Sequence, residues 1–381
     1  MRDTVALDRI GGRRRPSATR SRFALQRVAG AVGRRVGARA QSWLRSKALR
    51  NPRYSTLFYF LEGSFDRELH SVLAGKEAHV RSARSGDDRA SLDAATFTLR
   101  RNTHRIEKGL LMRPRRDVFA TSYIGETVDA YRTASPSADA DLVRWSTDVL
   151  DEYFDVVSDE GPIQDARLAY GRVRTRGGEE REERRIPYLR DTAPLPVTIE
   201  DFEALAHRRR SVRWFRSEPV PRAAVDRALA AALQSPSACN RQPFQFRIFD
   251  DPALVSHVAE VPMGTSGYVH NIPAVAVIVG RQRAYFSERD RHLIYVDSSL
   301  AAMSFMFALE VQGIASCPIN WPDIPDREAR MAEMLGLDAD ERPVMLVAFG
   351  YPDPDGAVAY SQKKSISEAR TYNEAPGASL D

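Results

Sequence analysis

The stretch SPSACNRQPF, residues 235–244, stands where a helical pattern ends and a strand pattern begins. Its short polar side chains and its prolines favour a rigid loop, and the backbone amides of such a loop can face a polar heterocycle. An ordinary turn between a helix and a strand explains the same residues equally well. The meaning of this stretch therefore depends on the sequence on either side of it.

Alternating helices and strands surround this stretch. Residues 244–249 alternate between apolar and polar side chains as a strand does, and residues 273–280 form a continuous apolar run that indicates a buried strand. Two further strands are expected at residues 315–319 and 343–350, and Pro221 opens a helix. The chain from residue 199 onward is therefore expected to mix helices with strands.

A long helix is expected at residues 290–313, and its apolar residues wrap most of its circumference. A helix that is apolar on all sides must be buried on all sides. A domain of this size cannot easily cover such a helix, so the pattern predicts a homodimer with its interface along the helix. Arginine at Met303 or Met306 should then disrupt the dimer if that residue faces the partner. No stretch approaches the run of about 20 apolar residues that a membrane-spanning helix needs.

The first 50 residues form a basic arm. They contain fourteen Arg and Lys residues against Asp3 and Asp8, a net charge of +12, which leaves −7 for the remainder because the whole chain carries +5. This composition predicts a disordered segment that an anionic surface or an acidic partner attracts. We expect no specific recognition of nucleic acid. The arm also lacks the apolar segment of a secretory signal.

Residues 51–196 have a mostly helical pattern. Helices are expected in this region at residues 92–108, 118–131 and 142–157. A cluster of prolines marks its end and the main domain boundary: Pro187, Pro194 and Pro196. The predicted organisation is a basic arm (1–50), a helical accessory region (51–196) and a mixed domain (197–375).

The two cysteines, Cys239 and Cys317, are too few for a disulfide framework and indicate a reducing compartment. The seven histidines are scattered, and no Cys or His cluster has the spacing of metal ligands. We therefore expect a cytoplasmic protein without a metal site.

Three further stretches carry polar chemistry. In RRRSVRWF, residues 208–215, guanidinium groups and a hydroxyl stand close enough to clamp a phosphate, although such a run is also common on solvated surfaces. In GIASCPINW, residues 313–321, a strand leaves the long helix. GYP at residues 350–352 leads to QKKS at residues 362–365, whose lysines alone would indicate only a surface tail.

Taken together, in this order and spacing, these stretches resemble the nitroreductase family of FMN flavoproteins. The resemblance covers residues 201–373 and rests on RRSxRxF, SPSxxNxQPFxF, the long buried helix and the passage from GYP to KK. It implies an α+β nitroreductase-like FMN-binding fold, with a central, mainly antiparallel sheet flanked by helices and preceded by the helical N-terminal region. It also implies a homodimer with composite sites.

The resemblance assigns roles to individual positions. The FMN phosphate and ribityl chain would be held by Arg209, Arg210, Ser211 and Arg213. The loop that reaches the FMN bound mainly by the partner subunit would contain Pro236, Ser237, Ala238, Asn240 and, with less weight, Gln242. The segment beside the isoalloxazine would be Pro318, Ile319 and Asn320. A last cation would come from Lys363 or Lys364; the family's usual Lys-x-Arg is absent, because the next arginine is Arg370.

The implied activity is an FMN-dependent oxidoreductase that moves hydride from NAD(P)H to a nitro, quinone or other conjugated small-molecule acceptor in ping-pong order. No catalytic side chain is expected, because the flavin carries the chemistry. Two alternatives stay open: a flavin-dependent dehydrogenase acting on a peptide or glycan-linked substrate, and a flavin-binding scaffold without turnover.

The N-terminal half offers one polar motif at residues 102–110. His104, Glu107 and Lys108 gather near Gly109, which is expected to end a helix as its C′ residue. They form either a polar substrate site or an ordinary charged helix end. This motif ahead of a nitroreductase domain resembles bacterial proteins associated with polysaccharide biosynthesis.

Overall fold

The computed structural model describes residues 38–82, 89–174 and 184–373. The chain divides into two compact units, Met1–His70 and Ser71–Asp381. Of the arm predicted to be disordered, residues 1–37 lie outside the described residues, whereas Ala38–Ala48 forms helix α2. The domain boundaries predicted at residues 50 and 196 stay a prediction.

The first unit holds α2 and α3 (Pro52–Glu62), and α4 (Asp66–Ser82) begins in it. Asn51 caps α3, because its Oδ1 accepts a hydrogen bond from Arg53 N at 2.9 Å. Gly63 ends α3 in the left-handed conformation, with φ of 76°. None of the α3 side chains is buried, so the helices in the described part of this unit are mostly exposed.

The second unit begins with a helical region. Its helices after α4 are α5 (Arg89–Leu110), α6 (Ile124–Ala134), α7 (Ala140–Val156) and α8 (Pro162–Val173). Their core contains Leu99, Ile106, Tyr131, Leu150 and Tyr153. The mostly helical pattern predicted for this region is therefore found, with differences at individual helices.

Three details differ from the sequence prediction. Helix α6 starts at Ile124 and not at residue 118, since Ala120 adopts φ of 61° and the preceding residues form turns. Helix α8 was not expected. Gly109 lies inside α5 and is not its C′ residue; a Cβ there would stand 2.2 Å from Cε2 of Phe119. Gly109 thus allows a close approach between α5 and the following loop.

In the described residues, four strands form one sheet in the order β1-β2-β4-β3, and every neighbouring pair is antiparallel. The strands are β1 (Phe244–Phe249), β2 (Ala274–Arg281), β3 (Ala315–Asn320) and β4 (Glu341–Gly350). Gly350 pairs with Ala315, and a Cβ at Gly350 would stand 2.4 Å from Cγ of Pro273. The predicted central antiparallel sheet is therefore confirmed, with strand ends within two residues of those expected.

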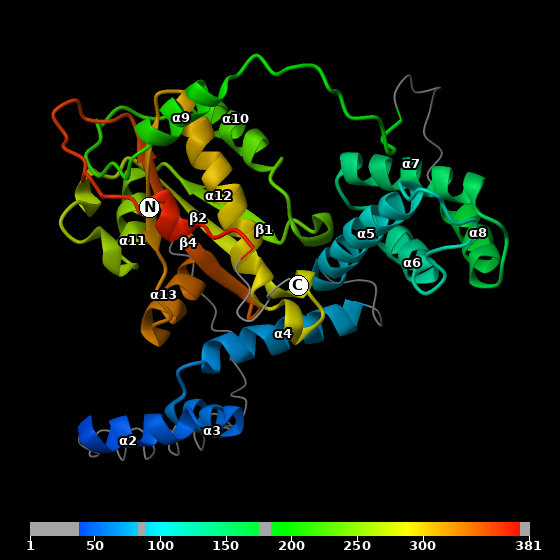
Figure 1. Cartoon of the computed structure of the whole chain (residues 1–381), viewed down its shortest axis with the longest axis horizontal. Coiled ribbons are helices and arrows are strands. Elements are labelled where there is room, and N and C mark those ends of the chain that lie inside the picture. The colour runs from blue at the N-terminus through cyan, green and yellow to red at the C-terminus, as the bar shows by residue number, and fades with distance from the viewer. Residues whose placement is uncertain (1–37, 83–88, 175–183, 374–381) are drawn as a thin grey trace, which may run out of the picture. The chain divides into compact units, whose positions relative to one another are not determined.

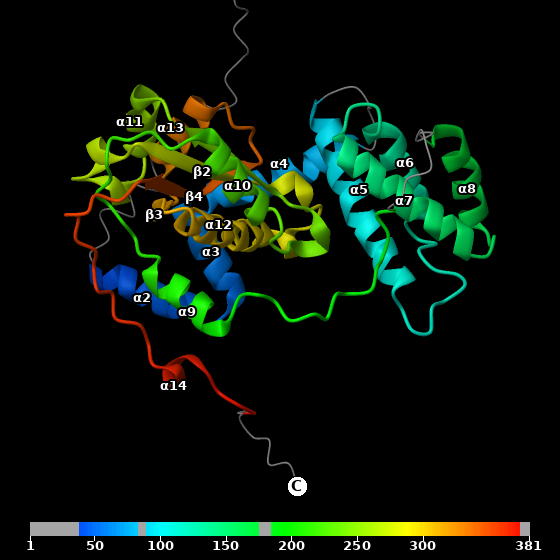
Figure 2. The same ribbon diagram turned by 90° about the horizontal axis from the view of Figure 1, so that it is seen from above.

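Helices cover both faces of the sheet. Helices α10 (Arg222–Ala232) and α12 (Leu293–Val311) pack on the face to which Ala274, Ala276 and Ile278 of β2 point. Helices α11 (Pro252–Ala259) and α13 (Pro325–Leu335) cover the opposite face, to which the alternate valines of β2 point. Figure 1 shows α10 and α12 side by side, and Figure 2 shows the sheet between the two helix layers.

Helix α12 keeps an apolar stripe outside this core. Its inner side chains, among them Phe305 and Met306, are buried on the sheet. On the outer side Val296 and Leu300 remain 47% and 43% exposed, and Phe307 is partly covered by Phe202 of α9 (Ile199–Arg208). A monomer therefore leaves part of α12 uncovered.

By length and composition, residues Glu288–Val311 could cross a bilayer, so the expectation that no segment is long and apolar enough was wrong. A core helix of a soluble protein passes the same test. Because α12 packs on the sheet through Ala302, Phe305 and Leu309, its apolar character is explained by this packing.

Candidate functional site

Five of the predicted residues line one small pocket. The pocket has a volume of about 90 Å³ and is lined by Arg209, Arg210, Ser211, Arg213, Ala359, Ser361 and Lys363. Four of these side chains are cationic, one predicted residue offers a hydroxyl, and no lining residue carries a carboxylate. We call this group of five predicted residues the cationic clamp.

Local structure brings the first part of the clamp to the sheet. Helix α9 ends at Arg208, and the chain then runs beside β3, where Ser211 forms a parallel bridge with Ser316 and Val212 N donates to Ser316 O at 3.1 Å. Asn271 fixes the segment further on, because its Oδ1 accepts from Phe215 N at 2.6 Å. The first part of the clamp is therefore held against the edge of β3, unlike a solvated run of arginines on the surface.

The C-terminal segment completes the clamp. Arg210 Nη2 donates to the carbonyl of Ala359 at 2.8 Å and also to that of Tyr360. This contact fixes the backbone that carries Lys363 into the pocket, while Lys364 is not among the lining residues. The sequence did not distinguish whether Lys363 or Lys364 supplies the last cation, and the lining of the pocket favours Lys363.

The clamp has unused hydrogen-bonding capacity. Arg209 Nε and Ser316 Oγ are buried, and neither has a hydrogen-bond partner. Buried polar atoms normally have partners, so such groups indicate an absent ion or ligand. Nearby, Arg208 forms an ion pair with Glu310 at 3.0 Å. That carboxylate therefore neutralises Arg208 and not the arginines of the clamp. The donor set is suited to a phosphate.

The loop Pro236–Gln242 has an unusual backbone. Cys239, Asn240 and Gln242 all adopt positive φ, at 52°, 52° and 51°. Left-handed conformations are uncommon for residues other than glycine and cost about 1–3 kcal/mol each. Ser237 holds the loop by accepting from Gln242 N at 3.0 Å through its Oγ. Strain of this kind concentrates at functional sites.

Asp297 anchors the loop, and sequence reasoning missed it. Its buried carboxylate accepts hydrogen bonds from Ala238 N, at 3.1 Å, and from the Tyr285 hydroxyl. Burial raises the pKa of the Asp297 carboxyl, and burial also raises the pKa of Tyr285 well above its ordinary value. Tyr285 thus stays protonated and donates. The available signal was an acidic residue inside an otherwise apolar helix.

The loop and the clamp are not brought together within one chain. The loop is anchored at Asp297 and precedes β1, whereas the clamp follows Arg208 beside Glu310 and β3. At 1.5 Å per residue, Asp297 and Glu310 lie about 20 Å apart along α12. Strands β1 and β3 are also the opposite edges of the sheet. The loop and the clamp therefore lie near opposite ends of α12 and towards opposite edges of the sheet.

The third predicted group lies on β3. Pro318 and Asn320 are exposed, whereas the Ile319 side chain is buried in the core below. Because the Ser316 carbonyl faces the outer edge of β3, the backbone groups of Pro318 and Asn320 face that edge too. Pro318 has no N–H, so Asn320 offers the free backbone donor.

The polar motif of the helical region is internally paired. Trp145 Nε1 donates to Glu107 at 2.9 Å, and His104 Nδ1 lies 3.4 Å from the second oxygen of Glu107. These contacts agree with a charged helix surface and give no separate indication of a substrate site.

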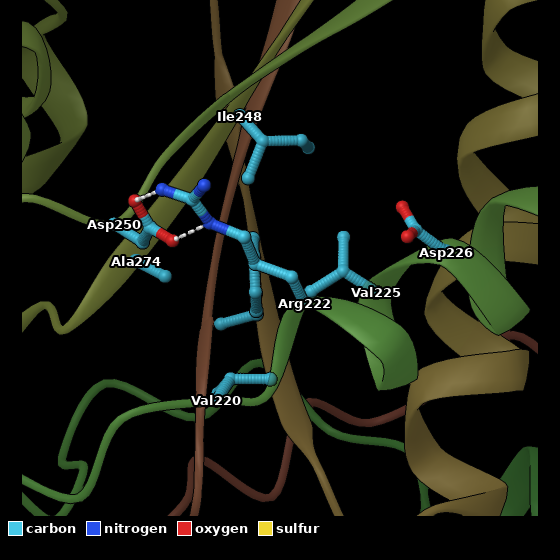
Figure 3. Close-up of a pocket in the computed structure, with 8 residues that line it drawn as sticks. Val220, Arg222, Val225, Asp226, Ile248, Asp250 and Ala274 are labelled. Carbon is cyan, nitrogen blue, oxygen red and sulfur yellow. Dashed lines mark hydrogen bonds and ion pairs between the residues drawn. The ribbon is translucent and has the colours of Figure 1, made fainter.

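A larger pocket, of about 330 Å³, lies beside α10. In Figure 3 the Arg222 guanidinium faces Asp250, at 2.7 Å and 3.0 Å, while Ile248 and Val220 contribute apolar walls. Its arginine is already neutralised, and no predicted residue lines it. The small clamp, with its buried and unpaired Arg209 Nε, is the better candidate site despite its size.

Comparisons with known proteins agree on the C-terminal region. The model of the Nitroreductase family matches residues 206–266 and 253–351. NADH dehydrogenase of Thermus thermophilus is 29% identical over 195 residues, which cover 43% of this chain and 92% of that protein. Iodotyrosine deiodinase 1 of Mus musculus is 22% identical over 217 residues, covering 48% and 74%. The structure of an FMN-dependent nitroreductase from Clostridium difficile R20291 covers 45% of this chain and 98% of its own, with 20% identity and a TM-score of 0.39.

The region matched by the family runs from the end of α9 to the end of β4 and includes all four strands. This region is similar to the nitroreductase family, and the predicted fold class, a mainly antiparallel sheet flanked by helices and preceded by a helical region, is confirmed. The match contains the loop and the clamp residues up to Arg213, whereas Lys363 lies beyond it. The resemblance of the N-terminal region to proteins of polysaccharide biosynthesis stays a prediction.

Proposed function

We propose that this chain binds FMN and transfers hydride between NAD(P)H and a nitro, quinone or other conjugated acceptor in ping-pong order. The observation that carries the proposal is the cationic clamp, whose buried Arg209 Nε lacks a partner beside Arg213 and Lys363. A phosphate monoester would supply the acceptor oxygens that these donors lack. The clamp suits one terminal phosphate, which favours FMN over FAD.

Each part of the chain then has a separate task. Arg209, Ser211 and Lys363 bind the phosphate, and Arg210 holds the C-terminal segment in place. The Asn320 N–H, at the outer edge of β3, would donate to the ring. Bound FMN supplies the hydride chemistry, so the chain itself needs no obligatory acid or base. What remains for the protein is to orient the reactants and exclude water.

The active unit is proposed to be a homodimer. A twofold axis across the exposed stripe of α12 would bury Val296 and Leu300 of both copies. It would also bring the loop held by Asp297 in one copy towards the Arg208 end of α12 in the other. The separation of loop and clamp within one chain supports this arrangement. The two unpaired cysteines are in keeping with the cytoplasm as the site of action.

Turnover tests this function directly. The purified protein should oxidise NADH or NADPH in the presence of a quinone or a nitroaromatic compound, with parallel lines in double-reciprocal plots. Iodotyrosine belongs in the same panel, because similar proteins carry the name iodotyrosine deiodinase. A flavin-loaded protein that turns over none of these acceptors would favour the scaffold alternative.

Removing one donor of the clamp should weaken flavin binding. Arg209→Ala should cost about 1.5–3 kcal/mol, the value of one charge-assisted hydrogen bond, which raises the FMN Kd by about 10- to 150-fold. Lys363→Ala should act in the same direction, and Lys364→Ala is its matched control because Lys364 does not line the pocket. Flavin fluorescence titration measures all three. An unchanged Kd for Arg209→Ala would remove Arg209 from the site.

Deleting residues 1–50 should leave the flavin site intact. These residues belong to the first compact unit, whereas the clamp and the loop belong to the second. The flavin-to-protein ratio and the quinone turnover of the truncated protein should equal those of the full chain. Loss of flavin would show that the arm folds onto the body.

A further inference from the structure

The first compact unit exposes an unusual number of large apolar side chains. Across α2, α3 and the start of α4, ten such residues are at least 41% exposed: Trp43, Leu44, Leu49, Tyr54, Leu57, Tyr59, Phe60, Leu61, Phe65 and Leu69. Phe60 and Leu49 reach 74% and 82%. Because helix α3 has no buried residue, these side chains do not form a core. The exposure of so many large apolar side chains in one short segment indicates an interaction surface.

Basic residues dominate the charge of this segment up to Leu61, and Glu62, Asp66 and Glu68 follow at the end of α3 and the start of α4. Residues 9–61 contain fourteen Arg and Lys residues and no Asp or Glu. Within the described part, exposed Arg45, Lys47, Arg50 and Arg53 flank the apolar side chains of α2 and α3. Lys47 Nζ also lies 5.6 Å from the centre of the Trp43 ring. A uniformly anionic surface therefore complements this segment better than a protein surface of mixed charge does.

We propose that α2 and α3 dock on the surface of an anionic lipid bilayer. Aromatic and aliphatic side chains would enter the boundary between headgroups and acyl chains, and the basic side chains would face anionic headgroups. Nucleic acid would neutralise the positive charge but would not bury the exposed leucines and phenylalanines. Helix α3 has only 11 residues, too short to span a bilayer, so this segment lies on the membrane.

Vesicle sedimentation with the full-length protein tests the proposal. Vesicles of phosphatidylcholine with one quarter phosphatidylglycerol should bind the protein about tenfold or more tightly than phosphatidylcholine alone, because each basic residue near the surface adds to the attraction. High salt should reduce this difference. No binding, or equal binding to both vesicles, would overturn the proposal.

Two variants separate the apolar and the charged contributions. Phe60→Ser with Leu61→Ser should weaken binding to the anionic vesicles about tenfold or more, since both side chains would otherwise enter the interface. The matched control is Leu189→Ser with Leu195→Ser, two side chains that are 86% and 81% exposed in the second unit, and it should bind like the wild type. Unchanged binding of the first variant would refute the role of α3.

Charge reversal gives an independent result. Arg45→Glu with Lys47→Glu and Arg50→Glu should abolish the preference for anionic vesicles while leaving flavin content unchanged. The alternative occupant is a second copy of the chain. If Phe60→Ser with Leu61→Ser lowers the molar mass in light scattering without lipid, α3 covers its partner copy and the bilayer proposal is wrong. The proposal does not depend on the flavin.

Discussion

Replacing Leu300 with arginine should convert a yellow dimer into a colourless monomer. Leu300 is 43% exposed on the outer face of α12, next to Val296, so the change should leave the core of one chain intact. In the dimer the new charge would be buried without a partner, at a cost of about 3–5 kcal/mol. The dimer Kd should rise by about a hundredfold or more.

Light scattering and the flavin-to-protein ratio measure the two effects together. Leu254→Arg is the matched control: Leu254 is 53% exposed, but it lies on α11 at the opposite face of the sheet. The control should stay dimeric and yellow. A Leu300→Arg protein that remains dimeric with full flavin content would remove α12 from the interface.

Replacing Asp297 with alanine should release the loop that we propose reaches the partner's flavin. The change leaves the Ala238 N–H and the Tyr285 hydroxyl without their acceptor, and each buried unpaired group costs about 1–3 kcal/mol. Flavin retention and turnover should therefore fall by about tenfold or more. Asp297→Asn is the matched control and should be milder, because it keeps an acceptor oxygen.

Mixing two defective proteins tests whether the site is composite. If the clamp of one chain serves the loop of the other, a heterodimer of Arg209→Ala and Asp297→Ala chains has one intact site. Random mixing of the two variants should then restore about a quarter of the wild-type sites. Sites built within single chains would show no recovery, because every chain would carry one defect.

The sheet was predictable because its signals are local. Residues 273–280 form an unbroken apolar run, and β2 (Ala274–Arg281) lies there, fully buried except at its end. Helices α11 and α13 were missed, since they are short and each begins with a proline that also signals a turn. Local patterns thus located the strands but not every helix that covers them.

The orientation of α12 could not be read from its sequence. Apolar residues surround this helix, so no pattern distinguishes the side on the sheet from the side left open. Met306, one of the two positions expected to test the interface, is only 5% exposed and lies in the core, whereas Met303 is half-buried. Arginine at Met306 would test folding and not association. Leu300 became the informative position only from the structure.

The candidate site shows the same limit. Arg209, Arg210 and Ser211 are adjacent in sequence, so their proximity is automatic. Lys363 joins them through hydrogen bonds from Arg210 to backbone carbonyls some 150 residues away, which only the family resemblance anticipated. The role of Asp297 was missed because it depends on the tertiary position of Ala238, although an acidic residue in an apolar helix was a weak signal. Side chains that support a site through backbone contacts carry little sequence signal.

The absorption spectrum of the purified protein, followed by mass measurement of the released cofactor, tests the central proposal most directly. The clamp predicts a flavin spectrum that bleaches when NADPH or NADH is added without oxygen, and a released cofactor with the mass of FMN. A purified protein that stays colourless after incubation with FMN, or that releases FAD as its main cofactor, would contradict the assignment of the clamp to the FMN phosphate.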